Sequence, residues 1–133
     1  PGDGIDGIKR FFLETLASFG RRGLACQPAS IGVGLGGNKD TCMRIGKEAA
    51  CLRVVGDVNP DPEVARLEHE LKELGNSIGM GPMGLEGQKL VVDCHVEDAY
   101  THTGGMPMRI HSFCHSSAPT AASIYGTGRV ASR

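Results

Sequence analysis

The sequence predicts one small domain of the α/β class, in which short strands and about three helices form a mixed α+β arrangement. Its 133 residues suit a single domain. Three stretches place apolar residues at helical spacing, and short stretches between them alternate as strands do. We assign residues 1–114 to this domain and residues 115–133, which are rich in Ser, Ala, Thr and Gly, to a tail or linker.

The first helix is expected to begin near Gly4 with Asp3 as its N-cap, and Gly20 should end it. One apolar face supports this helix, formed by Ile5, Ile8, Phe12, Leu16 and Phe19. The next stretch, 25–37, has a cysteine just before a proline and an apolar run that alternates with glycine. Residues 31–35 therefore predict a thin strand that another backbone or a ligand can approach closely.

Gly36 and Gly37 predict a turn after that strand, and Asn38 or Asp40 can cap a helix over residues 39–52. Cys42, Ile45 and Ala49 should face inward, so Cys42 reads as a small buried hydrophobe. A third helix is expected to begin with Asp61 as N-cap and Pro62 at its first position, and to stop at Gly75. Its buried stripe is Val64, Leu67, Leu71 and Leu74, whereas residues 68–70 are expected to be solvated.

Residues 78–87 contain four glycines and predict a loop, either plain surface or ligand-facing. Residues 89–96 form the clearest strand, and the charges of Asp93 and Glu97 suggest a wet face. The chain turns at residues 101–105. A second strand then runs from Met108 to Cys114.

The charge balance and cysteine content restrict the function. A formal net charge of −1 argues against nonspecific binding to nucleic acid or to an anionic membrane surface. No apolar run is long enough for a membrane span. The five cysteines form no CxxC pair, and no secretory signal precedes them, so reduced thiols in a cytoplasmic protein fit best. The start at Pro1 suggests a piece of a longer chain.

Three ordered motifs resemble the iron–sulfur hydro-lyases of the class I fumarase and L-tartrate dehydratase family. The first is Cys26 with the glycine run 31–37, although Gln27 and Asn38 depart from the proline and threonine of the family pattern. The second is the glycine-rich segment 79–87. The third is the stretch 93–102, which ends in His102 twelve residues before Cys114. The resemblance covers the chain from Pro1 to about residue 117.

The resemblance implies that residues 1–114 are part of an α-type catalytic domain that binds a 4Fe–4S cluster through Cys26 and Cys114. His102 would be the catalytic histidine, and Gly36 and Gly37 would offer backbone N–H groups to an anion or to cluster sulfide. The substrate would be a small dicarboxylate, hydrated or dehydrated as in the interconversion of fumarate and malate or the dehydration of tartrate. A second domain or β subunit would complete the enzyme, which is expected to be a homo-oligomer.

In this family three cysteines hold the cluster, and only two of them are identifiable here. We therefore expect the chain alone to fold without a stable cluster and without activity. Two alternatives stay open. Residues 32–37 satisfy G-x-G-x-x-G with Asp57 about twenty residues on, which is the pattern of a dinucleotide-binding module. The isolated chain can also be a cofactor-free assembly domain.

Overall fold

The computed structural model describes residues 2–22, 27–114 and 122–132. Within these residues the order is α1 (Gly4–Arg21), β1 (Ala29–Gly36), α2 (Lys39–Leu52), α3 (Pro62–Asn76), a 3₁₀ turn η1 (Pro82–Gly84), β2 (Val91–Ala99), β3 (Met108–Phe113), β4 (Ala122–Ile124) and β5 (Val130–Ser132). The predicted mixed α/β class is confirmed, and so are the three helices among the described residues.

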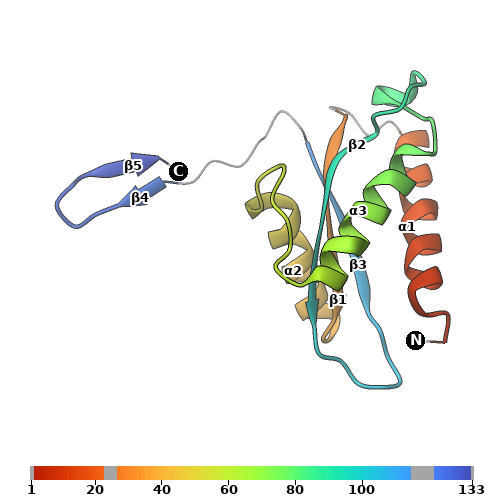
Figure 1. Cartoon of the computed structure of the whole chain (residues 1–133), viewed down its shortest axis with the longest axis horizontal. Coiled ribbons are helices and arrows are strands. Elements are labelled where there is room, and N and C mark those ends of the chain that lie inside the picture. The colour runs from red at the N-terminus through yellow and green to blue at the C-terminus, as the bar shows by residue number, and fades with distance from the viewer. Residues whose placement is uncertain (1, 23–26, 115–121, 133) are drawn as a thin grey trace.

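A three-stranded sheet in the order β2-β1-β3 is the centre of the molecule. β1 pairs in parallel with β2 and antiparallel with β3. The crossover from β1 to β2 passes through α2 and α3. Figure 1 shows α2 on one side of the sheet and α1 with α3 on the other. These layers bury both faces of β1.

The face covered by α1 and α3 holds the apolar core. Phe12 and Leu16 of α1 meet Leu71 of α3 over Ile31 and Val33 of β1, and all five side chains are nearly inaccessible to solvent. Burying large aliphatic and aromatic side chains stabilises each by about 1.5–3 kcal/mol. The helical stripes predicted from the sequence therefore meet on one side of the sheet.

The face covered by α2 is packed backbone to backbone. A Cβ atom added at Gly32 would lie 2.2 Å from the Gly46 carbonyl oxygen, and one added at Gly34 would lie 2.0 Å from the Cys42 carbonyl oxygen. Any side chain at these two positions would push α2 off the strand. The approach expected at the alternating glycines is thus made by another backbone, that of α2.

Helix boundaries agree with the predicted caps at two of three starts. The Asn38 side chain accepts a hydrogen bond from the Thr41 N–H at 2.7 Å, and the Asp61 side chain accepts from the N–H groups of Glu63 and Val64. Asp3 occupies the N-cap position of α1 but caps nothing, because its carboxylate pairs with Arg10.

The predicted stop at Gly75 was wrong by one residue, since α3 continues to Asn76. Gly75 serves packing instead. A Cβ atom added there would lie 2.9 Å from side-chain atoms of both Leu16 and Val91. The glycine allows α3 to lie close to α1 and β2.

The expectation that residues 68–70 are solvated was wrong for Glu68, which is 6% exposed. Its carboxylate pairs with Arg53 and accepts hydrogen bonds from the Val96 N–H at 2.8 Å and the Asn59 N–H at 3.1 Å. Asp93, expected on a wet face, is 7% exposed and accepts from the Gly56 N–H at 2.6 Å. These two carboxylates attach the α2–α3 connection to β2.

Residues 122–132, within the stretch assigned to a tail or linker, contain a short hairpin. β4 and β5 pair antiparallel, and the Arg129 guanidinium lies 4.3 Å from the centre of the Tyr125 ring. A two-stranded hairpin is marginally stable on its own. The boundary at residue 114 stays a prediction.

Candidate functional site

The topology sorts the predicted site residues between two ends of the sheet. Cys114 directly follows Phe113, which lies opposite Ser30 at the start of β1. Thr101 bonds to Gly37, just past the end of β1, so the neighbouring His102 belongs to the other end. We call these the cysteine end and the histidine end. In Figure 1 the β2–β3 loop, which carries His102, lies at the bottom of the sheet.

One described site residue, Cys114, lies at the cysteine end of the sheet. Cys114 is half-buried at the end of β3. Cys26 lies outside the described residues, but it precedes Ala29, the first residue of β1, by only three positions. Because β1 and β3 are antiparallel neighbours, the start of one strand lies beside the end of the other.

The cysteine end also holds two buried polar atoms without partners. Gln27 is 9% exposed, and its Oε1 accepts a hydrogen bond from the Met83 N–H at 2.7 Å, while its Nε2 has no partner. Ser30, 6% exposed, has an unpartnered Oγ. Buried polar groups are nearly always hydrogen-bonded, so two unsatisfied donors within four residues point to an acceptor such as a carboxylate or a sulfide.

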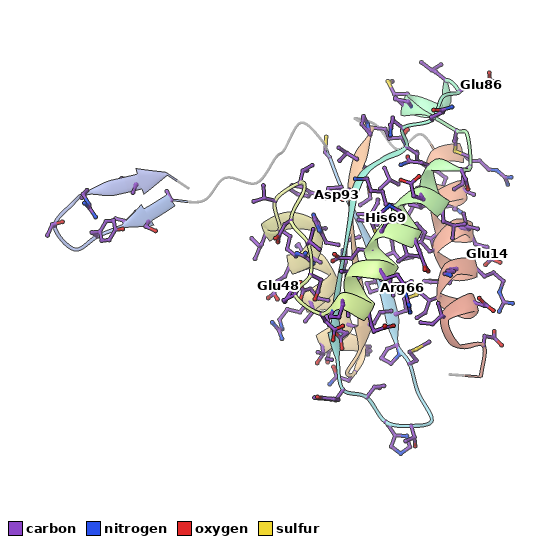
Figure 2. All side chains as sticks on the ribbon, in the orientation of Figure 1. Glu14, Glu48, Arg66, His69, Glu86 and Asp93 are labelled. Carbon is purple, nitrogen blue, oxygen red and sulfur yellow. The ribbon has the colours of Figure 1, made fainter. Side chains whose placement is uncertain are left out.

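The loop of residues 79–87, whose Met83 N–H donates to Gln27, has a strained backbone. Met83 and Glu86 adopt φ angles of 56° and 65°, in the left-handed region that side chains disfavour. The loop is placed against α1, where a Cβ atom added at Gly20 would lie 1.7 Å from the Met80 sulfur. Figure 2 shows Glu86 of this loop at the top, the end of the molecule opposite the β2–β3 loop. Such strain often accompanies ligand sites.

The histidine end, by contrast, is satisfied internally. The Gly36 N–H donates to the Pro107 carbonyl at 2.9 Å, and the Thr101 hydroxyl bonds to the carbonyls of Gly37 and Gly105 at 3.0 and 3.1 Å. His102 is exposed, and its Nδ1 accepts from the Gly104 N–H at 3.0 Å. The Gly36 N–H, predicted to bind an anion, is therefore already used.

The glycine pattern does not have the geometry of a dinucleotide site. In that fold the glycines form the turn after a strand and open the next helix. Here Gly32 and Gly34 lie inside β1, facing α2. Only Gly36 and Gly37 reach the turn, with φ angles of 78° and 66°. The pattern is explained by helix packing, which weakens this alternative.

We tested whether the residues present fit an iron–sulfur cluster. Within the described ranges no three His, Cys, Asp or Glu side chains come together as a metal site. Cys94 is not a candidate, because burial raises the pKa of its thiol far above the usual range and keeps it protonated. The unsatisfied donors of Gln27 and Ser30 do fit a sulfur-rich or anionic group beside Cys114. A cluster bound at this end would need further thiolates, from Cys26 and from other residues outside the described ranges.

Sequence reasoning missed His95, which lies in mid-strand and is completely buried with neither ring nitrogen bonded. Its Nε2 is 3.7 Å from an Asp93 oxygen, and burial lowers the pKa of the imidazole although Asp93 opposes this. Only the strand's alternation could have indicated that this side chain faces α2. A hollow of about 320 Å³ lies nearby, between α3 and the α2–α3 connection, and is lined by residues including Lys72 and Asp93. Figure 2 labels Asp93 there.

No helix among the described residues has the length and apolar character to cross a membrane.

Comparison with known proteins points to one family. The sequence model of the family described as Fumarate hydratase (Fumerase) matches residues 1–122. A Methanocaldococcus jannaschii protein, provisionally named L(+)-tartrate dehydratase subunit alpha, is 44% identical over 114 residues, or 86% of this chain and 39% of that protein. The L(+)-tartrate dehydratase subunit alpha of Escherichia coli K12 is 32% identical over 114 residues, or 86% of this chain and 37% of its own length. The chain thus spans under two fifths of these relatives.

Proposed function

Because this chain belongs to the fumarate hydratase (Fumerase) family, we propose that it is part of a hydro-lyase that adds water to, or removes it from, a small dicarboxylate. The relatives named as tartrate dehydratase subunits support tartrate as a substrate, and the family name supports fumarate and malate. The observation that carries the proposal is the pair of unsatisfied buried donors, Gln27 and Ser30, at the end of the sheet where Cys114 lies.

Cys114 and Cys26 would hold a 4Fe–4S cluster, and a third thiolate would come from outside the described residues. The bound cluster would supply a Lewis-acidic iron that polarises the substrate hydroxyl. The chain itself would position the dicarboxylate. The Gln27 Nε2 would donate to one carboxylate oxygen, because its Oε1 is fixed by Met83 and the amide cannot turn away. The Ser30 hydroxyl, three residues further along the chain, is a second unpartnered donor.

Loss of water from a hydroxy acid also requires removal of a carbon-bound proton. Asp93, the register partner of Ser30 on β2, is a carboxylate at this end of the sheet, but it already accepts from the Gly56 N–H at 2.6 Å and from Lys72 at 3.3 Å. We therefore assign that role to a second domain or β subunit, as the α-subunit names of the relatives suggest. A cytoplasmic enzyme built from several chains fits this assignment, with the cluster absent from the 133-residue chain alone.

The test uses the full-length protein purified without oxygen together with its partner subunit. Iron and acid-labile sulfide are measured, and turnover is assayed with fumarate, malate and L-tartrate. We expect about four iron atoms per α chain and turnover of at least one of these acids. A protein that takes up no iron and sulfide, and is inactive on all three, would refute the proposal and favour a cofactor-free assembly domain.

A further inference from the structure

The connection between α2 and α3 has its polar groups inside and its apolar side chains outside. The Arg53 guanidinium, only 12% exposed, pairs with Glu68, and the Asn59 N–H donates to the same carboxylate at 3.1 Å. The Gly56 N–H donates to the buried Asp93 carboxylate at 2.6 Å. Every third residue from Arg53 onward is thus held against α3 and β2.

The apolar side chains of the same segment point outward. Its exposed members form what we call the valine patch, which consists of Leu52, Val54, Val55 and Val58, all between 46% and 70% exposed. Single exposed apolar residues are normal on a folded protein. Four of them within residues 52–58 are a concentration that marks an interaction surface.

The hydrogen bonds of the connection prevent the valine patch from turning inward. β2 is an outer strand of the sheet, and the connection covers its edge. The Asn59 side chain donates to the Val96 carbonyl at 3.0 Å, and Glu68 accepts from the Val96 N–H at 2.8 Å. Turning the connection over would leave the buried Glu68 and Asp93 carboxylates without their partners, which is costly. The patch is therefore held outward on a fixed backbone.

The hollow between α3 and the connection adjoins the valine patch. Val58 belongs to both, and the other walls include Asp57 of the connection and Lys72 of α3. The strongest contacts of an interface are large side chains that fill such pockets, surrounded by apolar contacts that exclude water. A covering segment can therefore rest on the patch and place one long side chain in the hollow.

We propose that the valine patch is the surface on which the rest of the α subunit docks. The matched residues are 39% of the Methanocaldococcus jannaschii relative, so about three fifths of such a subunit lies outside them. That part is covalently attached, which gives it a higher effective concentration at the patch than a separate chain has. The four side chains of the patch are all aliphatic, and permanent interfaces are more apolar than transient ones.

The proposal takes from the proposed function only the assignment to an α subunit. It depends on neither the cluster nor the substrate, and none of its tests measures iron or turnover. A failure of the hydro-lyase assignment is therefore seen separately from a failure of the docking surface.

Thiol labelling of Val55→Cys tests the proposal in the full-length α subunit, with the labelled peptide quantified by mass spectrometry. The new thiol should react at least about tenfold more slowly in the native subunit than after unfolding in urea, at every protein concentration and without the β subunit. Lys47→Cys, on the exposed face of α2, is the matched control and should stay reactive. Protection that needs the β subunit or self-association, equal protection of both thiols, or no protection would overturn the proposal.

Photocrosslinking in the complete enzyme identifies the occupant. With p-benzoylphenylalanine in place of Val58, ultraviolet light should join this position to a peptide of the same α subunit that lies outside residues 1–133. Mixing isotope-labelled and unlabelled subunits distinguishes links within one copy from links between copies. The same probe at Lys47 should not reach that peptide. A link to the β subunit, to a second copy or to residues 1–133, or no link at all, would refute the docking.

Thermal unfolding of the full-length α subunit gives a third measurement. Val55→Asp would bury an unpaired charge and should lower the Tm by about 5 °C or more, whereas Lys47→Glu should leave it within about 1 °C. If Val55→Asp does not fold, Val55→Thr buries a hydroxyl instead and should lower the Tm by about 2–4 °C. An unchanged Tm in whichever variant folds would show that the patch stays in water and would contradict the proposal.

Discussion

The two ends of the central sheet differ in how completely their polar groups are satisfied. At the histidine end the Gly36 N–H donates to the Pro107 carbonyl, the Thr101 hydroxyl donates to the Gly37 carbonyl, and Asn38 caps α2. At the cysteine end Gln27 and Ser30 leave buried atoms unpartnered. The loop that contacts Gln27 carries two side chains in a left-handed backbone conformation.

From this difference we infer a structural role for the histidine end and propose the cysteine end as the ligand end. A finished hydrogen-bond network contributes to stability and has nothing left to bind with, whereas unsatisfied donors and strain persist when a ligand compensates for them. Changes to the hydrogen-bonded residues of the histidine end, such as Gly36 and Asn38, should therefore alter stability, whereas a change of the exposed His102 should alter turnover. Changes at the cysteine end should alter cofactor or substrate binding.

The largest effect on folding is expected from Gly36→Ala in the 133-residue chain. Its φ of 78° disfavours a side chain, and the new Cβ atom would lie 2.0 Å from the Ala99 carbonyl oxygen. We expect the free energy of unfolding to fall by about 3 kcal/mol or more, measured by urea denaturation. Gly105→Ala is the matched control, since nothing lies within 4 Å, and it should change stability by under about 0.5 kcal/mol. Equal losses of stability in the two variants would show that the turn at Gly36 has no special structural role.

The sequence predicted the elements better than their surroundings. Apolar stripes located α1 and α3, and capping residues located α2 and α3, because these signals are local. Glu68 and Asp93 were misjudged because their burial depends on Arg53 and Gly56, which lie far away in the chain. The separation of His102 from Cys114 was also invisible, because twelve residues of sequence say nothing about strand direction.

A smaller, selective effect is expected from Gln27→Leu in the full-length enzyme. The change keeps the volume but removes the Nε2 donor and the bond to Met83. We expect KM for the dicarboxylate to rise about tenfold, the equivalent of about 1.4 kcal/mol, as one charge-assisted hydrogen bond is lost. Asn38→Ala, at the other end, should cost about 1 kcal/mol of stability and leave KM unchanged. Steady-state kinetics on both variants compares the two ends directly. An unchanged KM for Gln27→Leu would show that Gln27 only fixes the 79–87 loop and does not bind substrate.

The smallest effect concerns the middle of the sheet and is a pH dependence. Burial lowers the pKa of both His95 and His111, so the folded state takes up protons less readily than the unfolded state. Stability should therefore be constant above about pH 7 and fall as the pH drops below about 6.5, by up to about 1.4 kcal/mol per pH unit for each histidine. Asp57, whose pKa is lowered by its hydrogen bond from Arg53, contributes only at lower pH.

Urea denaturation between pH 5 and pH 8 measures this slope, and the interval lies within the range where histidines titrate. His111→Gln should remove part of the slope and leave the part due to His95. A free energy of unfolding that rises on acidification would contradict the burial of these two rings.

Cluster content in two variants of the full-length enzyme tests the contrast between the ends most directly. Iron and sulfide are measured, and the cluster spectrum recorded, for anaerobically purified Cys114→Ser and His102→Asn. We predict that Cys114→Ser loses the cluster, because the remaining thiolates cannot hold it, whereas His102→Asn keeps full iron and loses only turnover. Full iron and sulfide content in Cys114→Ser, or loss of the cluster in His102→Asn, would contradict the assignment of the cysteine end as the ligand site.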